Sequence, residues 1–220
     1  MKKNQIVLVN HQGLKLISGI QIQTPTPPIS LAYVGAYIKK YGYDYTAIDA
    51  CGEALSQIRK VEPDSDLMIQ GLTSKEVIKK IHGVDINVMA NYIYGLPGDT
   101  KETMKKTFDL SLELCTAGWN TYAAMALPGS QLYKNALDKK YKLPESYEGY
   151  SFHSYETQPL PTETLKPEEI LEYRDKSFIN YHTHKTFLDK IERKFGQKAL
   201  NNIQEMTKVN LKRKILDDRL

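Results

Sequence analysis

The feature that most constrains the fold is the segment Val88–Thr100, which combines a strand, a tight turn and a helix start. Its first seven residues are nearly all apolar, which is typical of a parallel strand covered on both faces. Gly95 and Gly98 let the backbone turn sharply and approach a ligand closely. Asp99 is suited to cap the following helix, and a glutamate three residues on completes a capping box. Such a corner exposes backbone N–H groups at the carboxyl edge of a sheet, where α/β proteins hold cofactors.

The start of the chain predicts a strand, a helix and a second strand. Residues 6–10 are a short β-branched run, and residues 45–49 have a similar composition. Between them, residues 11–28 form a long loop of a length that is usually functional or disordered. The helix at 29–40 has one apolar face, formed by Ile29, Tyr33, Ala36 and Tyr37. The segment therefore predicts a right-handed βαβ unit.

Further elements follow from similar signals. A short helix is predicted over 52–60, and a capping box of Thr73 and Glu76 opens a helix over 77–81. Strand 86–94 leads through the corner into a helix that ends at Gly118. The apolar stripe of that helix is Met104, Phe108, Leu112 and Cys115. Strand 119–127 then leads into a helix whose inward side chains are Leu132, Ala136 and Leu137.

The character of the chain changes after residue 141. Residues 142–166 are rich in tyrosine, proline, glutamate and serine, and predict an ordered arm or linker. Pro167 opens a long helix that extends to about Leu188, and another amphipathic helical segment runs over 197–215. The expected organisation is a βαβ region over 1–87, a βαβα region over 88–141, and a linker with a helical tail over 142–220.

Composition excludes several classes of protein. The chain has 220 residues and a net charge of +4 without any basic arm, which disfavours a nucleic-acid partner. No apolar run approaches the roughly 20 residues of a membrane helix, and the N-terminal apolar run is too short for a signal peptide. The two isolated cysteines form no disulfide framework, so we expect a cytoplasmic protein.

The N-terminal region resembles the front part of the cobalamin-binding domain of cobalamin-dependent radical S-adenosylmethionine (radical SAM) enzymes. The likeness rests on Gln5–Asn10, Pro27–Tyr43 and Ile48–Ala50, whose order and spacing fit that family. There, these pieces are a first strand with a ligand-side loop, a helix, and a second strand ending in aspartate. The resemblance implies a corrinoid ligand at this edge and identifies Asn10 and Gly13 as cofactor-binding residues.

Residues 88–156 resemble the last strands and helices of a radical SAM barrel. Strand 89–94 with the corner Gly95–Thr100 matches the penultimate conserved unit, and Thr121–Tyr133 matches the closing unit. Asp99 stands where the family has glutamate. In the family these strand ends help cradle the adenosine part of S-adenosylmethionine. By resemblance, the residues nearest that ligand are Tyr92, Ile93, Gly95, Leu127 and Pro128.

The chain departs from the family in what separates these two regions. A family member has the rest of the cobalamin fold and the front of the barrel there, including a Cys-x-x-x-Cys-x-x-Cys loop. In this chain the two matches meet near Asn87, and its only cysteines are Cys51 and Cys115. Because three thiolates are missing, no standard site can hold the [4Fe–4S] cluster. We therefore expect cobalamin or S-adenosylmethionine at most, no metal site, and no autonomous radical reaction.

Other patterns have ordinary structural interpretations. The corner itself is also compatible with a purely structural role. His182 and His184 point apart on a helix, which disfavours a shared metal ion. The run Lys212–Lys214 is typical of a solvated helix end, and both cysteines are expected to be buried small apolar groups. One tyrosine group is suited either to stacking on a flat substrate or, more often, to covering a core edge: Tyr141, Tyr147, Tyr150 and Tyr155.

We expect an α/β fold with a small, mainly parallel sheet of about four strands, Rossmann-like or a partial barrel, with flanking helices and a helical C-terminal tail. The first functional hypothesis is a shortened derivative of a cobalamin-dependent radical SAM enzyme, with no catalytic residues assigned. Its parent chemistry is methyl transfer or radical rearrangement of a small molecule, and its ligand is a nucleoside or corrinoid. The alternative is a non-catalytic accessory protein that pairs with a full-length relative through a sheet edge or the C-terminal helices. A third possibility is the product of an internally deleted gene.

Overall fold

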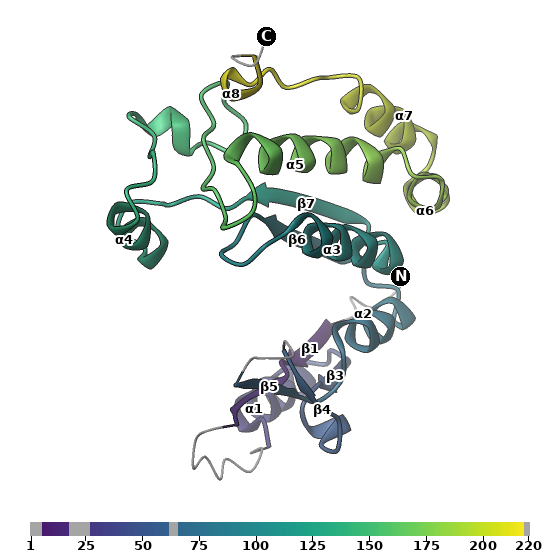
Figure 1. The fold of residues 1–220 in the computed structure, drawn as a ribbon. Coiled ribbons are helices and arrows are strands. Elements are labelled where there is room, and N and C mark those ends of the chain that lie inside the picture. The colour runs from purple at the N-terminus through teal and green to yellow at the C-terminus, as the bar shows by residue number, and fades with distance from the viewer. Residues whose placement is uncertain (1–5, 18–26, 62–65, 218–220) are drawn as a thin grey trace. The chain divides into compact units, whose positions relative to one another are not determined.

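The computed structural model describes residues 6–17, 27–61 and 66–217 (Figure 1). The chain divides into two compact units, residues 1–88 and residues 89–220, and each has its own core. The division falls beside Asn87, where the two resemblances meet. No helix among the described residues is long and apolar enough to cross a membrane.

The first unit is built around a parallel strand pair. The strands are β1 (Ile6–Asn10) and β3 (Tyr45–Asp49), and α1 (Ile29–Lys40) connects them, as the βαβ prediction requires. A second, antiparallel sheet has the order β2 (Gly13–Leu16), β5 (Leu67–Gln70) and β4 (Ile58–Lys60). The short helix η1 (Gly52–Ala54) and the helix α2 (Ser74–Gly83) complete the described elements of this unit.

The antiparallel sheet corrects two predictions for the first unit. The predicted loop 11–28 contains strand β2, although its residues 18–26 lie outside the described part. The predicted helix over 52–60 is a single short turn followed by β4. β2 pairs with β5, a partner far along the sequence, and β4 pairs with the same strand as its near neighbour; in both cases strand pairing overrides the local pattern.

The core of the first unit lies between β3 and α2. The buried side chains of this cluster are Ile48, Ala50, Ala54 and Leu72, and Val77 and Ile81 of α2 pack against them. The capping box predicted for α2 is confirmed: the Thr73 hydroxyl accepts from the Glu76 backbone N–H at 3.2 Å, and the Thr73 backbone N–H donates to the Glu76 carboxylate at 2.6 Å. On α1, by contrast, only Gly35 is buried.

The second unit contains a parallel pair formed by β6 (Met89–Tyr94) and β7 (Gly118–Ala123), with α3 (Lys101–Leu114) between them. After β7 come α4 (Gln131–Asp138), the short helix η2 (Tyr147–Tyr150), α5 (Pro167–His182), α6 (Lys185–Phe195), α7 (Gln197–Met206) and α8 (Lys214–Asp217). Figure 1 shows the chain beyond α7 returning along α5 to α8.

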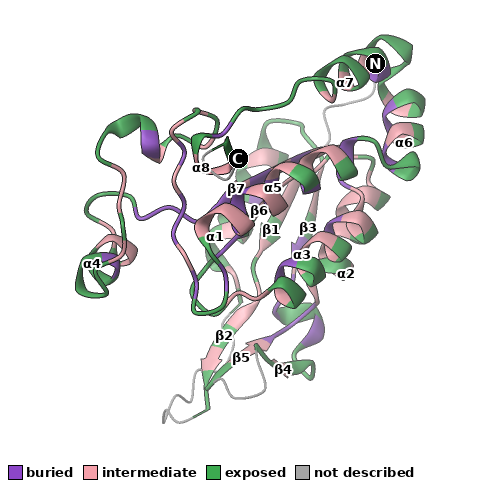
Figure 2. Ribbon diagram, turned by 45° about the horizontal axis from the view of Figure 1, so that its top comes forward, coloured by how far each residue is buried: buried purple, intermediate pink, exposed green. Residues whose placement is uncertain are grey.

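Helix α5 covers one face of the β6–β7 pair. Buried residues alternate along β7 and continue on α5 (Figure 2). The Trp119 ring stacks on Tyr181 with centroids 4.8 Å apart, and Phe187 and Ile191 of α6 join this cluster. The apolar residues Phe187 and Ile191 of α6 are therefore buried within the second unit itself.

The opposite face of β6 is open, which corrects the prediction of a strand covered on both faces. Tyr92 and Tyr94 lie on the covered face, whereas Met89 and Ile93 are exposed. A near-continuous apolar run does not reveal which face is buried, because that depends on what the rest of the chain brings to it.

Several helix boundaries also differ from the predictions. Helix α3 begins with Thr100, not Asp99, as its capping residue, and it ends at Cys115, whose φ of 43° is left-handed. The helix predicted to continue to Leu188 stops at His182, and α6 starts anew after His184. On α4, Ala136 is buried as predicted, but Leu137 is exposed.

The mixed α/β class is confirmed. The four predicted strands do not form one sheet among the described residues. They pair two by two, β1 with β3 and β6 with β7, in separate sheets of separate units. Both pairs are parallel and both enclose a helix, as predicted, but the predicted union of the two pairs in one four-stranded sheet is not observed.

Candidate functional site

The corner after β6 is held together by two carboxylates, chiefly that of Asp99. Asp99 Oδ2 accepts from the backbone N–H of Gly95 at 2.9 Å and of Leu96 at 3.1 Å. Asp99 Oδ1 accepts from the Thr103 hydroxyl at 2.7 Å. The Gly98 N–H donates to Glu163 Oε2 at 3.0 Å. The donors that were expected to meet a ligand are thus taken by the protein's own carboxylates, which occupy the place of an anion.

Gly95 is covered by a helix and not by open space. Its φ is +78°, and a Cβ atom at this position would lie 2.7 Å from the Ile170 side chain of α5. The cavity beside the corner, between Gly95 and α4, has a volume of only about 60 Å³. Ligand pockets typically have volumes of roughly 300–1,000 Å³, so this cavity is too small for a nucleoside.

The structure does not gather the five residues predicted to lie near S-adenosylmethionine. Tyr92 packs on Trp119 with ring centroids 5.9 Å apart, and burial raises its pKa to about 12. Ile93 lies on the opposite, open face of β6. Leu127 and Pro128 are exposed in the turn before α4. Of the five, only Gly95 lies within the closed corner.

In the first unit, Asn10 and Gly13 lie near the carboxyl ends of β1 and β3. Asn10 Nδ2 donates to Asp49 Oδ1 at 2.8 Å, and the same oxygen accepts from the Gly52 N–H at 2.9 Å. A Cβ at Gly13 would meet the Cys51 sulfur at 3.1 Å. Asn10, Asp49 and Gly52 are therefore engaged with one another.

The two cysteines lie in different units of the chain. Cys51 is buried in the first unit, and Cys115 is half-buried in the second. Burial raises the pKa of the Cys115 thiol, although nearby Lys190 and Arg193 oppose this shift. Among the described residues, no three histidine, cysteine, aspartate or glutamate side chains gather as metal ligands.

The histidine pair is divided between two environments. His182 is buried among Trp119, Phe178 and Phe187, and its Nδ1 donates to the Phe178 carbonyl oxygen at 2.8 Å. Burial lowers the pKa of His182, an effect opposed by this hydrogen bond. His184 is exposed and precedes α6. His182 therefore has a packing role.

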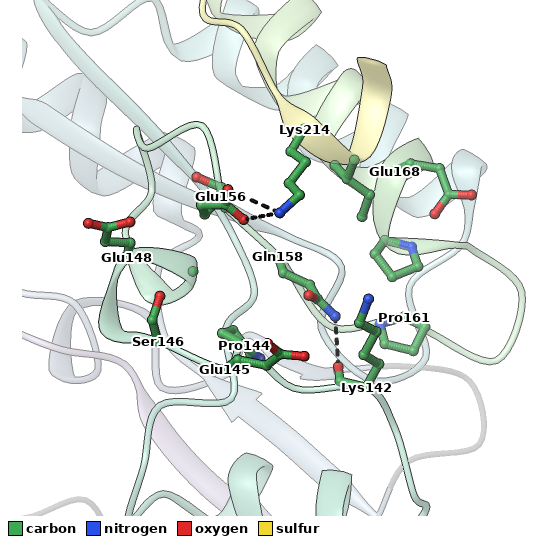
Figure 3. Close-up of a pocket in the computed structure, with 14 residues that line it drawn as sticks. Lys142, Pro144, Glu145, Ser146, Glu148, Glu156, Gln158, Pro161, Glu168 and Lys214 are labelled. Carbon is green, nitrogen blue, oxygen red and sulfur yellow. Dashed lines mark hydrogen bonds and ion pairs between the residues drawn. The ribbon is translucent and has the colours of Figure 1, made fainter. Parts of the chain in front are cut away.

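A cavity of about 680 Å³ lies between the arm after α4 and the helices α5 and α8 (Figure 3). Its wall is polar: Lys214 pairs with Glu156 at 2.9 Å, and Gln158 Nε2 donates to the Lys142 carbonyl oxygen at 3.0 Å. Three further carboxylates line it, those of Glu145, Glu148 and Glu168. None of the four predicted stacking tyrosines lines this cavity, and Tyr141 packs instead on the Ala136 cluster.

No protein-family model and no curated protein sequence matches this chain. The functional assignment therefore depends on the residues and their geometry.

The sequence analysis missed a buried charge network in the second unit. Arg213, predicted in a solvated helix end, is only 1% exposed. Its Nε and Nη2 donate to the two oxygens of Asp175 at 2.9 and 3.0 Å, and Asp175 Oδ1 also accepts from Arg174 Nη1 at 2.8 Å. Arg174 is itself buried and donates through Nε to the Thr121 carbonyl oxygen at 2.9 Å. No local pattern reveals this network, because Asp175 lies 38 residues before Arg213.

Proposed function

We propose that this chain is a shortened, cluster-free derivative of the cobalamin-dependent radical SAM enzymes that works as a non-catalytic accessory protein. Its partner is a larger relative of that family, and the docking surface is the exposed face of α1. The observation that carries this proposal is a stripe of large side chains along α1 that its own unit leaves uncovered.

The stripe follows the helical repeat. Ile29, Tyr33, Tyr37 and Tyr41 succeed one another at intervals of four residues, so they form one line on the helix surface. Tyr33 is 75% exposed and Tyr37 is 62% exposed, and the Tyr37 and Tyr41 rings lie 4.7 Å apart. Contiguous exposed apolar surface marks interaction sites, and tyrosine is enriched at the centres of protein interfaces.

The charges around the stripe indicate the charge expected on the partner's surface. Lys39 and Lys40 lie in the last turn of α1, and its first turn has no acidic residue. Both lysines are exposed beside the tyrosines. The complementary surface is an apolar groove bordered by carboxylates, because interfaces pair opposite charges at their rims.

The ligand-binding alternative has less support. The corner of β6 has no donor left for an anion and no cavity of nucleoside size, so retention of S-adenosylmethionine there has no geometric basis. The two parallel β–α–β pieces support the proposed ancestry, because Rossmann-like sheets and barrels are built from such units.

Binding between the purified chain and a cobalamin-dependent radical SAM protein of the same genome tests this proposal. Isothermal titration calorimetry should give a one-to-one complex, and Tyr33→Lys should weaken it by at least about tenfold. Tyr147→Lys is the matched control, because Tyr147 is 89% exposed but lies in the second unit. Equal affinity for both variants, or no complex at all, would overturn the docking surface.

Ligand titrations test the cluster-free part separately. Anaerobic reconstitution with iron and sulfide, read by electron paramagnetic resonance, should give no [4Fe–4S] signal. A stoichiometric cluster would contradict the proposal. Tight binding of hydroxocobalamin or S-adenosylmethionine would favour the ligand-binding alternative over the accessory role.

A further inference from the structure

The second unit contains a pocket that neither the resemblance nor the proposed function uses. It has a volume of about 610 Å³ and lies between α5 and the segment that follows α7. Figure 1 shows this segment returning along α5 towards α8. The volume falls within the range of roughly 300–1,000 Å³ that is typical of small-molecule sites. We name it the Arg174 pocket after the buried arginine in its wall.

One wall of the Arg174 pocket is apolar. Phe178 and Ile179 of α5 face Val209 and Leu211 of the returning segment across it. Val209 is 65% exposed and Leu211 is 40% exposed. These side chains are only partly covered by the described residues, and a bound apolar group would remove their remaining surface from water, which is the main favourable term in binding.

The buried charge network behind the pocket wall, of which Arg174 and Asp175 line the pocket, has an excess of positive charge. Arg174 and Arg213 are both buried, and both donate to the single carboxylate of Asp175. The remaining bonds of Arg213 go to neutral acceptors: the carbonyl oxygens of Phe152 and Ser154 and the hydroxyl of Thr157. Two guanidinium groups thus share one carboxylate, although buried charges are normally paired.

The other titratable groups facing the pocket do not cancel this excess. Glu172 and Lys176 form an ion pair of 2.6 Å with each other at the exposed side of α5. His153 lies beside Arg174, and burial together with the two arginines lowers its pKa, while Asp175 opposes the shift. An imidazole carries no negative charge whether it is protonated or not, so His153 does not offset the two arginines.

Arg174 has one donor group that is poorly satisfied. Within the described residues, the partner of its Nη2 is His153 Nε2 at 3.4 Å, near the limit for a hydrogen bond. Arginine prefers carboxylate oxygens, which it binds through short charge-assisted hydrogen bonds. An anion entering the pocket would find this donor beside an apolar wall.

We propose that the Arg174 pocket binds a small amphiphilic carboxylate, with the carboxylate on Arg174 Nη2 and an alkyl or aryl body between Phe178 and Leu211. The site is independent of the α1 docking surface, because it lies wholly within the second unit. The ligand class follows from the positive charge of Arg174 at one end of the pocket, which favours a carboxylate, and from the apolar wall, which favours a hydrocarbon body.

Titration of the full chain with decanoate tests this proposal, with decanol as the uncharged analogue. Calorimetry should give one site with a dissociation constant below about 1 mM, and decanol should bind at least about tenfold more weakly. Equal affinity for the two compounds, or no binding of decanoate, would overturn the assignment.

Variants and spectroscopy locate the site without disturbing the buried arginines. Val209→Glu places a negative charge in the exposed wall and should weaken decanoate at least about tenfold, whereas Val209→Gln should retain more of the affinity. Leu137→Glu, on exposed α4, is the remote control and should change nothing. Nuclear Overhauser contacts from the methylene groups should reach Phe178 and Ile179. Contacts to the tyrosines of α1 instead, or unchanged affinity in Val209→Glu, would contradict the proposal.

Discussion

Arg213 and Asp175 form a two-point ion pair in which Nε and Nη2 of the guanidinium each donate to a different carboxylate oxygen. The pair joins the residue just before α8 to the middle of α5. It also positions Asp175 to receive Arg174 on the same oxygen that accepts from Nη2.

Arg213→Met should lower the free energy of unfolding of the second unit by about 3 kcal/mol, because it leaves the carbonyl oxygens of Phe152 and Ser154 without their buried donor. Urea unfolding followed by the fluorescence of Trp119, the only tryptophan, reports on this unit. Lys212→Met is the matched control, since Lys212 is exposed, and should change stability by less than about 0.5 kcal/mol. Equal effects would show that Arg213 contributes no more than a surface lysine.

Gly95→Ala should be destabilising by roughly 2 kcal/mol more than Gly98→Ala. Both glycines have positive φ, +78° and +87°, so the backbone strain of alanine is similar at the two positions. Only at Gly95 does the added methyl group meet another side chain, that of Ile170. The same urea titration measures the difference. Ile170→Ala should relieve part of the cost, so the double variant should lose less stability than the sum of the single variants.

Acid should destabilise the second unit partly through His182. Burial lowers the pKa of His182 in the folded state, so the unfolded chain binds more protons as the pH falls. The resulting stabilisation is present above the unfolded value of about 6.5 and is lost as the pH falls through it towards the folded pKa. His182→Gln should show a shallower loss of unfolding free energy between about pH 7.5 and pH 5 than the unaltered chain. Parallel profiles for the two proteins would exclude this contribution.

Thr73→Ala should lower the stability of α2 by about 1 kcal/mol, because the threonine hydroxyl accepts a hydrogen bond from the Glu76 N–H at the helix start. Tryptophan fluorescence does not report on the first unit, because Trp119 lies in the second. Hydrogen exchange of the α2 amides measures the stability of this helix directly. Ser74→Ala, one residue inside the helix and exposed, should leave the exchange rates nearly unchanged.

The sequence predicted those features whose determinants lie a few residues apart. The Thr73–Glu76 box, helix 29–40 and the helix that opens at Pro167 all depend on neighbours within one or two turns. The corner shows the limit of such reasoning: a sharp turn at Gly95 was predicted, but Asp99 binds the turn's own N–H groups and Thr100 caps α3.

The misses share a dependence on distant partners. Residues 13–16 form a strand because β5, more than 50 residues later, pairs with them. One face of β6 is exposed because no described element of the second unit packs against it. Arg213 is buried because α5 presents Asp175 to it. The closed environment of Gly95 could not be predicted for the same reason, since Ile170, which contacts it, lies 75 positions later on a helix whose docking no local pattern encodes.

The return of the chain over α5 also sets an order of events during synthesis. The first unit has all its described strand partners by Gln70, so it can close while the rest of the chain is still being made. The second unit cannot complete its charge network until Arg213 has left the ribosome, roughly ten seconds after the first unit at typical elongation rates. During that interval Arg174 and Asp175 lack their third partner and Phe178 lacks the returning segment. We therefore expect this unit to be completed later than the first and to be the part of the described chain that most needs a chaperone.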